Sequence, residues 1–168
     1  MAQALLMSWA VVAAIFDWRY RRLPNWLTLG AFAAGAGYIL ITGAAPLGGE
    51  PMMNWLAAGV AFGVLFPVYL SHWMGAGDVK LFAAMGLLGG GKVLLPTFVV
   101  ASLLLGGWAL IRLAFMGDPF PGRENRDARP THDGKQREPV RAIPFGVGLS
   151  VGFVLSVLGL LPSLPLPW

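Results

Sequence analysis

The sequence predicts an all-α integral membrane protein with six transmembrane helices and both termini outside the cytoplasm. The chain is 57% hydrophobic and only 12% charged, and its mean hydropathy is +0.67. Its apolar runs approach the length of about 17–25 residues that a membrane helix needs. Its basic residues lie in short segments between those runs, as in membrane proteins. The 168 residues therefore predict one membrane-embedded domain, 1–168, rather than a soluble one.

The apolar runs give six candidate spans. The fourth run is too short to cross a hydrocarbon core of about 30 Å at about 1.5 Å per residue. We expect it to begin inside the membrane, after non-helical chain that packs on protein or lines a wet cavity. The expected spans are 1–16, 26–42, 54–71, 79–90, 93–116 and 143–161.

The orientation follows from lysine and arginine, which are enriched on the cytoplasmic side of membrane proteins. The connections after the first, third and fifth spans carry basic residues, and the alternate ones hold only Lys92. The three basic connections are therefore expected in the cytoplasm. The segment 117–142 is rich in Pro, Gly and mixed charge, which predicts a mobile cytoplasmic loop. The basic residues of these connections are Arg19, Arg21, Arg22, Lys80, Arg123, Arg126, Arg129, Lys135, Arg137 and Arg141.

Composition also excludes some classes of chemistry. The chain has no cysteine, which rules out disulfides, a thiol nucleophile and a cysteine-based zinc site. The net charge is +4, but the basic residues flank apolar runs. The lipid bilayer, and not nucleic acid, is therefore the expected partner of these charges.

Two of the eight acidic residues stand out by their position. Five lie in 117–142, and Glu50 lies in an external connection. Asp17 and Asp78 instead lie at the cytoplasmic ends of the first and fourth spans. A charged side chain at membrane depth costs about 2.5–3.5 kcal/mol on insertion scales, and such residues are usually retained for function.

Two carboxyls at one depth on different helices suggest a catalytic pair. Repulsion between like charges leaves one group protonated and one ionised. The ionised carboxylate can take a proton from water as it attacks a peptide carbonyl, and the protonated group can donate to the carbonyl oxygen. No metal or cofactor is needed. Gly75 and Gly77 lack a Cβ, so the chain beside Asp78 can approach an extended peptide closely.

Each aspartate also has a structural interpretation. Asp78 alone is suited to be the N-cap of the fourth span. Asp17 alone is suited to pair with Arg19 or Arg21 at the interface.

The residues around the two aspartates have structural interpretations as well. Lys80 is most simply an anchor at headgroup level, and if helical it points away from Asp78. Pro24 and Asn25 are most simply a turn into the second span, with Asn25 as its cap.

Three motifs together resemble those of the type IV prepilin peptidases, a family of intramembrane GxGD aspartic proteases. "DWRYRRLPN" (17–25) is similar to the family signature D-x-R-x-x-x-[IL]-P-N. "GAGDVK" (75–80) is similar to G-x-G-D-x-K, and "IPFG" (143–146) to the segment P-[FY]-G. The three motifs occur in order over nearly the whole chain.

The resemblance implies catalytic aspartates at Asp17 and Asp78. It implies supporting or substrate-binding roles for the other motif residues, and cleavage of a basic leader from a prepilin or pseudopilin at the cytoplasmic face of the bacterial inner membrane. The family's bifunctional members carry a CxxC domain and methylate the new terminus, which this cysteine-free sequence does not support. The short form resembles the peptidases of tight-adherence (Flp-type) pili, and also archaeal preflagellin peptidases. The supporting residues are Pro24, Asn25, Gly75, Gly77, Lys80, Pro144 and Gly146.

Two other functions remain open. Paired carboxylates between helices also suit a proton- or cation-coupled transporter, although no internal repeat is visible. A non-catalytic membrane protein of pilus assembly is the third possibility, although both expected acids are present.

Overall fold

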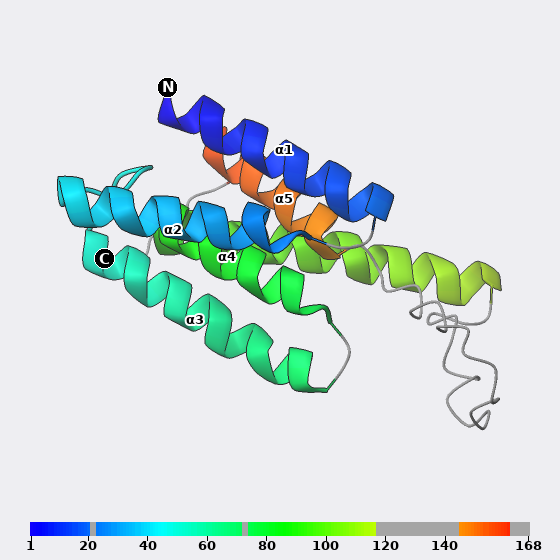
Figure 1. The fold of residues 1–168 in the computed structure, drawn as a ribbon. Helices are drawn as coiled ribbons and strands as arrows, with labels where there is room; N and C mark the ends of the chain where they lie inside the picture. The colour runs from blue at the N-terminus through cyan, green and yellow to red at the C-terminus, as the bar shows by residue number, and fades with distance from the viewer. Residues whose placement is uncertain (21–22, 72–73, 117–144, 162–168) are drawn as a thin grey trace.

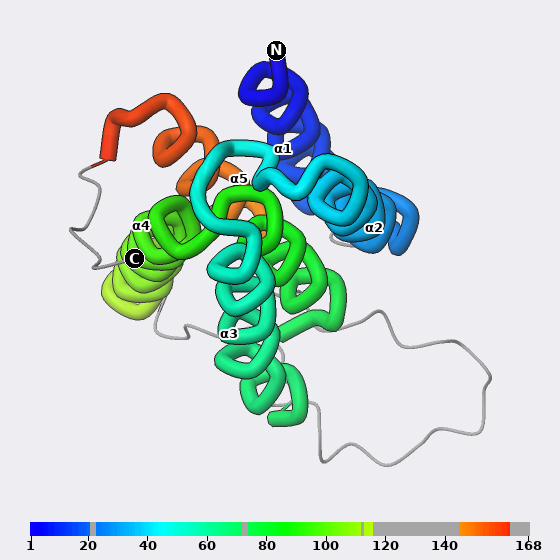
Figure 2. Tube along the Cα trace, turned by 90° about the vertical axis from the view of Figure 1, so that its left-hand side faces the viewer, coloured from blue at the N-terminus to red at the C-terminus, as the bar shows by residue number. Residues whose placement is uncertain are grey.

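The chain is described by a computed structural model over residues 1–20, 23–71, 74–116 and 145–161, which contain helices and connections but no strand. Figure 1 shows the helices lying roughly along one direction, and Figure 2 views the bundle after a 90° turn. The predicted all-α class is thus confirmed for these residues. The helices are α1 (Ala2–Tyr20), α2 (Asn25–Thr42), α3 (Pro51–Leu70), α4 (Ala76–Met116) and α5 (Phe145–Val157).

Helix α4 reverses its direction at Gly90, where φ is 64° and ψ is −172°. The ring centroids of Phe82 and Phe98 lie 5.5 Å apart, whereas sixteen residues of straight helix would separate them by about 24 Å. We call residues 76–89 the first arm of α4 and residues 91–116 the second arm. The arms lie side by side in Figures 1 and 2. They correspond to the predicted spans 79–90 and 93–116, and the first arm begins three residues earlier, at Ala76.

The reversal is held by Asn54, a buried residue of α3. Its Nδ2 donates a hydrogen bond to the carbonyl oxygen of Leu87 at 2.8 Å, just before the helical pattern breaks. A Cβ at Gly90 would lie 2.7 Å from Oδ1 of the same asparagine. The positive φ and this close contact both require glycine at position 90.

The first arm of α4 forms the centre of the bundle. Every residue from 81 to 90 is buried. Helices α2, α3 and α5 pack against α4, and α1 packs against α5. The outer surface carries large apolar side chains such as Ile41, Leu103 and Phe115. An exposed apolar surface of this extent indicates a membrane environment. The buried polar residues are Asp17, Thr28, Asn54, Thr97 and Ser150.

Three of the described helices, α2, α3 and α4, are long and apolar enough to cross a membrane. Helix α5 is apolar but has 13 residues, and α1 has 19 residues that include an aspartate and an arginine. The six spans and the outer placement of both termini therefore stay predictions. Helix α1 extends beyond the predicted end at residue 16, so Asp17 lies within a helix rather than after it. The predicted mobile loop, 117–142, lies outside the described residues.

Candidate active site

The two predicted aspartates come from different helices and face the same point of the bundle. Asp17 lies near the C-terminal end of α1 and is only 6% exposed. Asp78 lies in the first turn of α4. Neighbouring chain from the start of α5 contacts both carboxyls, as the following distances show.

Asp17 is held by the first turn of α5. The backbone N–H of Val147 donates to Oδ2 of Asp17 at 3.0 Å. The first N–H groups of a helix have no partner within it, and their partial positive charge favours a carboxylate. The N-terminus of α5 is therefore a natural partner for a buried acid. The alternative in which Asp17 pairs with Arg19 or Arg21 stays a prediction, and Arg21 lies outside the described residues.

Asp78 is the third residue of α4, so the expectation that it is the N-cap is wrong. The residue before the helix is Gly75, whose carbonyl oxygen accepts the N–H of Asp78 at 3.2 Å. The carboxyl of Asp78 accepts hydrogen bonds from the backbone N–H groups of Gly75 and Gly146. A carboxylate that reaches back to the N–H of the cap residue forms one half of a capping box. The second donor, from α5, lies outside that local pattern.

Gly146 lies between the two carboxyls. A Cβ built on it would lie 2.9 Å from Oδ2 of Asp17 and 3.1 Å from Oδ1 of Asp78. The separation of these two oxygens is therefore at most the sum of the two distances, about 6 Å. No side chain larger than hydrogen fits here without displacing a carboxyl, which explains a glycine at the start of α5.

This geometry suits acid–base chemistry. The two carboxyls lie close enough to interact electrostatically, and like charges at this range repel when both are ionised. Each also accepts a backbone hydrogen bond from α5, which fixes its orientation. Two oriented carboxyls that share a site can hold one proton between them, as a general acid and general base require.

A second contact joins the two motifs beside the aspartates. Nζ of Lys80 donates to Oδ1 of Asn25 at 3.0 Å, and a Cβ on Gly77 would lie 3.0 Å from Cβ of Leu23. The cap of α2 is Pro24, in extended conformation and without a side-chain cap hydrogen bond. The expectation that Asn25 caps α2 is therefore wrong, because its side chain accepts from Lys80 instead.

The structure thus brings most of the predicted site residues together. Val147 and Leu23 were not predicted; Val147 contributes through its backbone N–H, which leaves no mark in a sequence. Pro144 lies outside the described residues. Within the described ranges, no group of three or more His, Cys, Asp and Glu gathers where it could hold a metal ion. Gly75 and Gly146 contact the carboxyls themselves. Gly77 instead contacts Leu23, Lys80 bonds to Asn25, and Pro24 precedes α2.

Comparison with known proteins points to one family. Residues 4–110 match the family model described as the type IV leader peptidase family. This match covers Asp17, Asp78 and the two glycines of the GAGD segment, Gly75 and Gly77. It ends before α5.

Two curated proteins show the same relationship. Both are named prepilin leader peptidase/N-methyltransferase, one from Aeromonas salmonicida strain A449 and one from Aeromonas salmonicida. Each is 33% identical over 131 residues, which cover 70% of this chain and 43% of the relative. The chain therefore spans less than half the length of these relatives. No solved structure matches the chain.

Proposed function

Because this chain belongs to the type IV leader peptidase family, we propose that it is a membrane aspartic endopeptidase that removes the leader peptide from type IV prepilin-like proteins. One observation carries the assignment of its catalytic groups. Asp17 and Asp78, from separate motifs, both lie within about 3 Å of the Cβ position of Gly146, from the third motif. Three segments distant in the sequence converge on one pair of carboxyls.

The proposed reaction needs one proton on the pair. The ionised carboxylate takes a proton from water, and the water oxygen bonds to the scissile carbonyl carbon. The protonated carboxyl gives its proton to the carbonyl oxygen. When the C–N bond of the tetrahedral intermediate breaks, the carboxyl that took the proton from water gives it to the leaving amine. The other carboxylate takes a proton from a hydroxyl of the intermediate as the new carboxyl group forms, which restores the pair. Asp17 and Asp78 divide these two roles, and the backbone donors from Val147 and Gly146 keep both carboxyls oriented.

The substrate proposed is a prepilin or pseudopilin of the Flp type, with a basic leader on the cytoplasmic side of the bacterial inner membrane. The support is the short motif spacing and the glycines beside Asp78. Gly75, directly before α4, is exposed and Gly77 is half-buried in its first turn, so a substrate peptide can approach the backbone beside Asp78 closely. We confine the proposal to peptide cleavage, because methylation appears only in the name of the longer relatives.

The test is direct. The purified full chain in detergent is incubated with a Flp-type prepilin, and the products are identified by mass spectrometry. The proposal expects two products whose masses sum to the substrate plus one water, with a single cut between leader and mature pilin. A transporter or an inactive assembly protein leaves the prepilin intact, and that result from a well-folded sample would overturn the proposal.

A further inference from the structure

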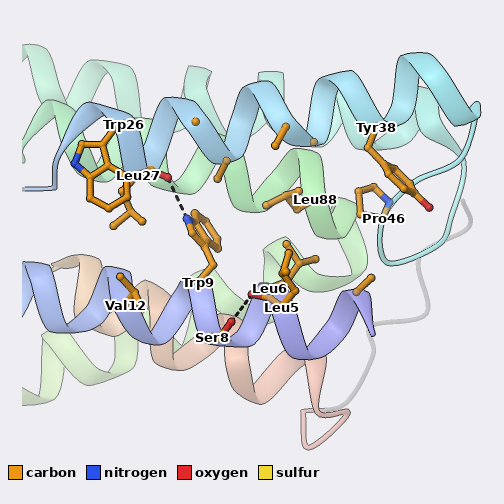
Figure 3. A pocket seen from close by; sticks show the side chains of 15 residues that line it. Leu5, Leu6, Ser8, Trp9, Val12, Trp26, Leu27, Tyr38, Pro46 and Leu88 are labelled. Atoms are coloured by element: carbon orange, nitrogen blue, oxygen red, sulfur yellow. Dashed lines mark hydrogen bonds between the residues drawn. The ribbon is translucent and has the colours of Figure 1, made fainter.

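An apolar groove lies between α1 and α2, apart from the two aspartates. Its volume is about 650 Å³, within the usual range of about 300–1,000 Å³ for small-molecule sites. Helix α1 packs mainly on α5 and α2 on α4, which leaves space between α1 and α2 themselves. Figure 3 shows Trp26 and Val12 at one end of the groove, and Tyr38 and Pro46 at the other.

The side chains that line the groove are almost all apolar. The few polar side chains are largely satisfied within the protein. The indole N–H of Trp9 donates to the carbonyl oxygen of Leu27 at 3.0 Å. The hydroxyl of Ser8 donates to the carbonyl oxygen of Leu5 at 2.8 Å. Both hydrogen bonds are drawn in Figure 3. An occupant therefore gains packing along the groove but few hydrogen bonds.

The groove opens to the outside of the bundle along its length. Leu5 is 69% exposed and Trp26 is 65% exposed, although both line it. From Trp26 to Tyr38 the groove follows α2 for about 18 Å. This length slightly exceeds half of a hydrocarbon core of about 30 Å, the depth of one leaflet. Its dimensions therefore match a single lipid acyl chain that enters from the side.

An aromatic cluster with a cation lies at the Trp26 end. The ring of Phe16 lies 5.9 Å from that of Trp26 and 5.6 Å from that of Tyr20. The guanidinium of Arg19 lies 6.0 Å from the centre of the Tyr20 ring. Arg19 follows Val12 of the groove wall by seven residues, which places it on the same face of α1 two turns further on. Aromatic and basic residues together are typical of headgroup level.

We propose that the α1–α2 groove binds one anionic phospholipid, with an acyl chain along the groove and the phosphate at Arg19. Apolar walls alone do not select a ligand in a bilayer, because the surrounding lipid is equally apolar. The selection comes from the positive charge of Arg19 at the Trp26 end, which attracts anionic headgroups. This site lies outside the aspartate pair and does not depend on peptidase activity.

The test uses native mass spectrometry of the delipidated full chain, titrated with phosphatidylglycerol or with phosphatidylcholine of the same acyl chains. The wild type should bind one phosphatidylglycerol about fivefold more tightly than phosphatidylcholine. Arg19→Gln should make the two affinities equal. Lys92→Gln removes an exposed charge from another part of the chain and should keep the preference.

A second pair of variants tests the acyl chain. Gly30 lines the groove and has open space at its Cβ position, so Gly30→Leu fills the groove without an internal clash. It should weaken binding of both lipids about tenfold or more. Gly63 lies on α3, outside the groove and also with open space at its Cβ position, and Gly63→Leu should bind as the wild type does.

Two results would overturn the proposal. One is a wild type without preference for phosphatidylglycerol. The other is a Gly30→Leu variant that binds phosphatidylglycerol unchanged; if the same variant raises KM for a prepilin, the groove binds the substrate instead. The unfolding midpoint of each variant in detergent verifies that it remains folded.

Discussion

Lys80 donates a hydrogen bond from Nζ to Oδ1 of Asn25 at 3.0 Å, which ties the beginning of α4 to the beginning of α2. This bond joins the segment that follows Asp78 to the segment that follows Asp17 in the sequence. It gives Lys80 a structural role, since the hydrogen bond holds two segments that each adjoin an aspartate in the sequence.

The first prediction concerns this bond. Lys80→Gln shortens the side chain and removes its charge, and we expect cleavage to fall by no more than about tenfold, since a hydrogen bond contributes about 0.5–1.5 kcal/mol and this one is exposed. Rates of prepilin cleavage at equal protein concentration provide the measurement. Lys92→Gln is the matched control, because Lys92 is exposed on the same helix. A loss of about 1,000-fold in a folded Lys80→Gln variant would assign Lys80 a part in the chemistry.

The second prediction concerns Gly146. The added methyl of Gly146→Ala would lie about 3 Å from both carboxyls and must displace at least one of them. A misplacement of about 1 Å in an active site can cost about 100-fold in rate, and we expect a loss of that order in kcat. Gly63→Ala is the control, since nothing lies within 4 Å of that Cβ position on α3. Near-normal turnover by Gly146→Ala would contradict this prediction and would mean that the start of α5 does not position the catalytic carboxyls.

The third prediction concerns the reversal of α4. Asn54→Leu removes the donor to the buried carbonyl of Leu87, and an unsatisfied buried group costs about 1–3 kcal/mol. The free energy of unfolding in a detergent titration should fall by that amount. Ser71→Ala removes an exposed hydrogen bond to Val68 and should change the unfolding free energy far less. Equal stability of both variants would mean that Asn54 does not hold the reversal.

The helices could be predicted because long apolar runs are a local property of the sequence. The runs 26–42 and 54–71 agree closely with α2 and α3. The short gap between the runs 79–90 and 93–116 predicted a change of direction near Gly90. It did not predict the hydrogen bond from Asn54 that stabilises the reversal. That contact joins residues 33 positions apart, and nothing periodic in the sequence marks it.

Some residues of the candidate site could likewise be predicted from the sequence, and others could not. Asp17 and Asp78 could be selected because acids are rare at the ends of apolar runs, and Gly146 only because its motif resembles that of a family. The donor N–H of Val147 could not be found, since every residue but proline carries such a group. The caps were misassigned at Asn25 and Asp78, because cap preference is a local rule and both side chains have partners on other segments.

The pair of aspartates makes a prediction about pH. Cleavage requires one carboxyl ionised and the other protonated, so the rate should fall on the acid side, where both hold protons, and on the alkaline side, where both are ionised. The measurement is kcat/KM for prepilin cleavage between pH 4 and 10, with detergent and salt constant. A rate that rises steadily over this whole range would contradict a shared proton.

The central claim is that Asp17 and Asp78 act as one catalytic unit. The most direct measurement is leader removal from a prepilin by Asp17→Asn, Asp78→Asn and the double variant, at matched membrane levels. Both substitutions keep size and polarity, and Glu50→Gln is the control at an exposed acid. Each single variant should lose nearly all activity, and the double variant little more, because residues that act as a unit are not additive. Substantial cleavage by either single variant, stably inserted, would contradict the account.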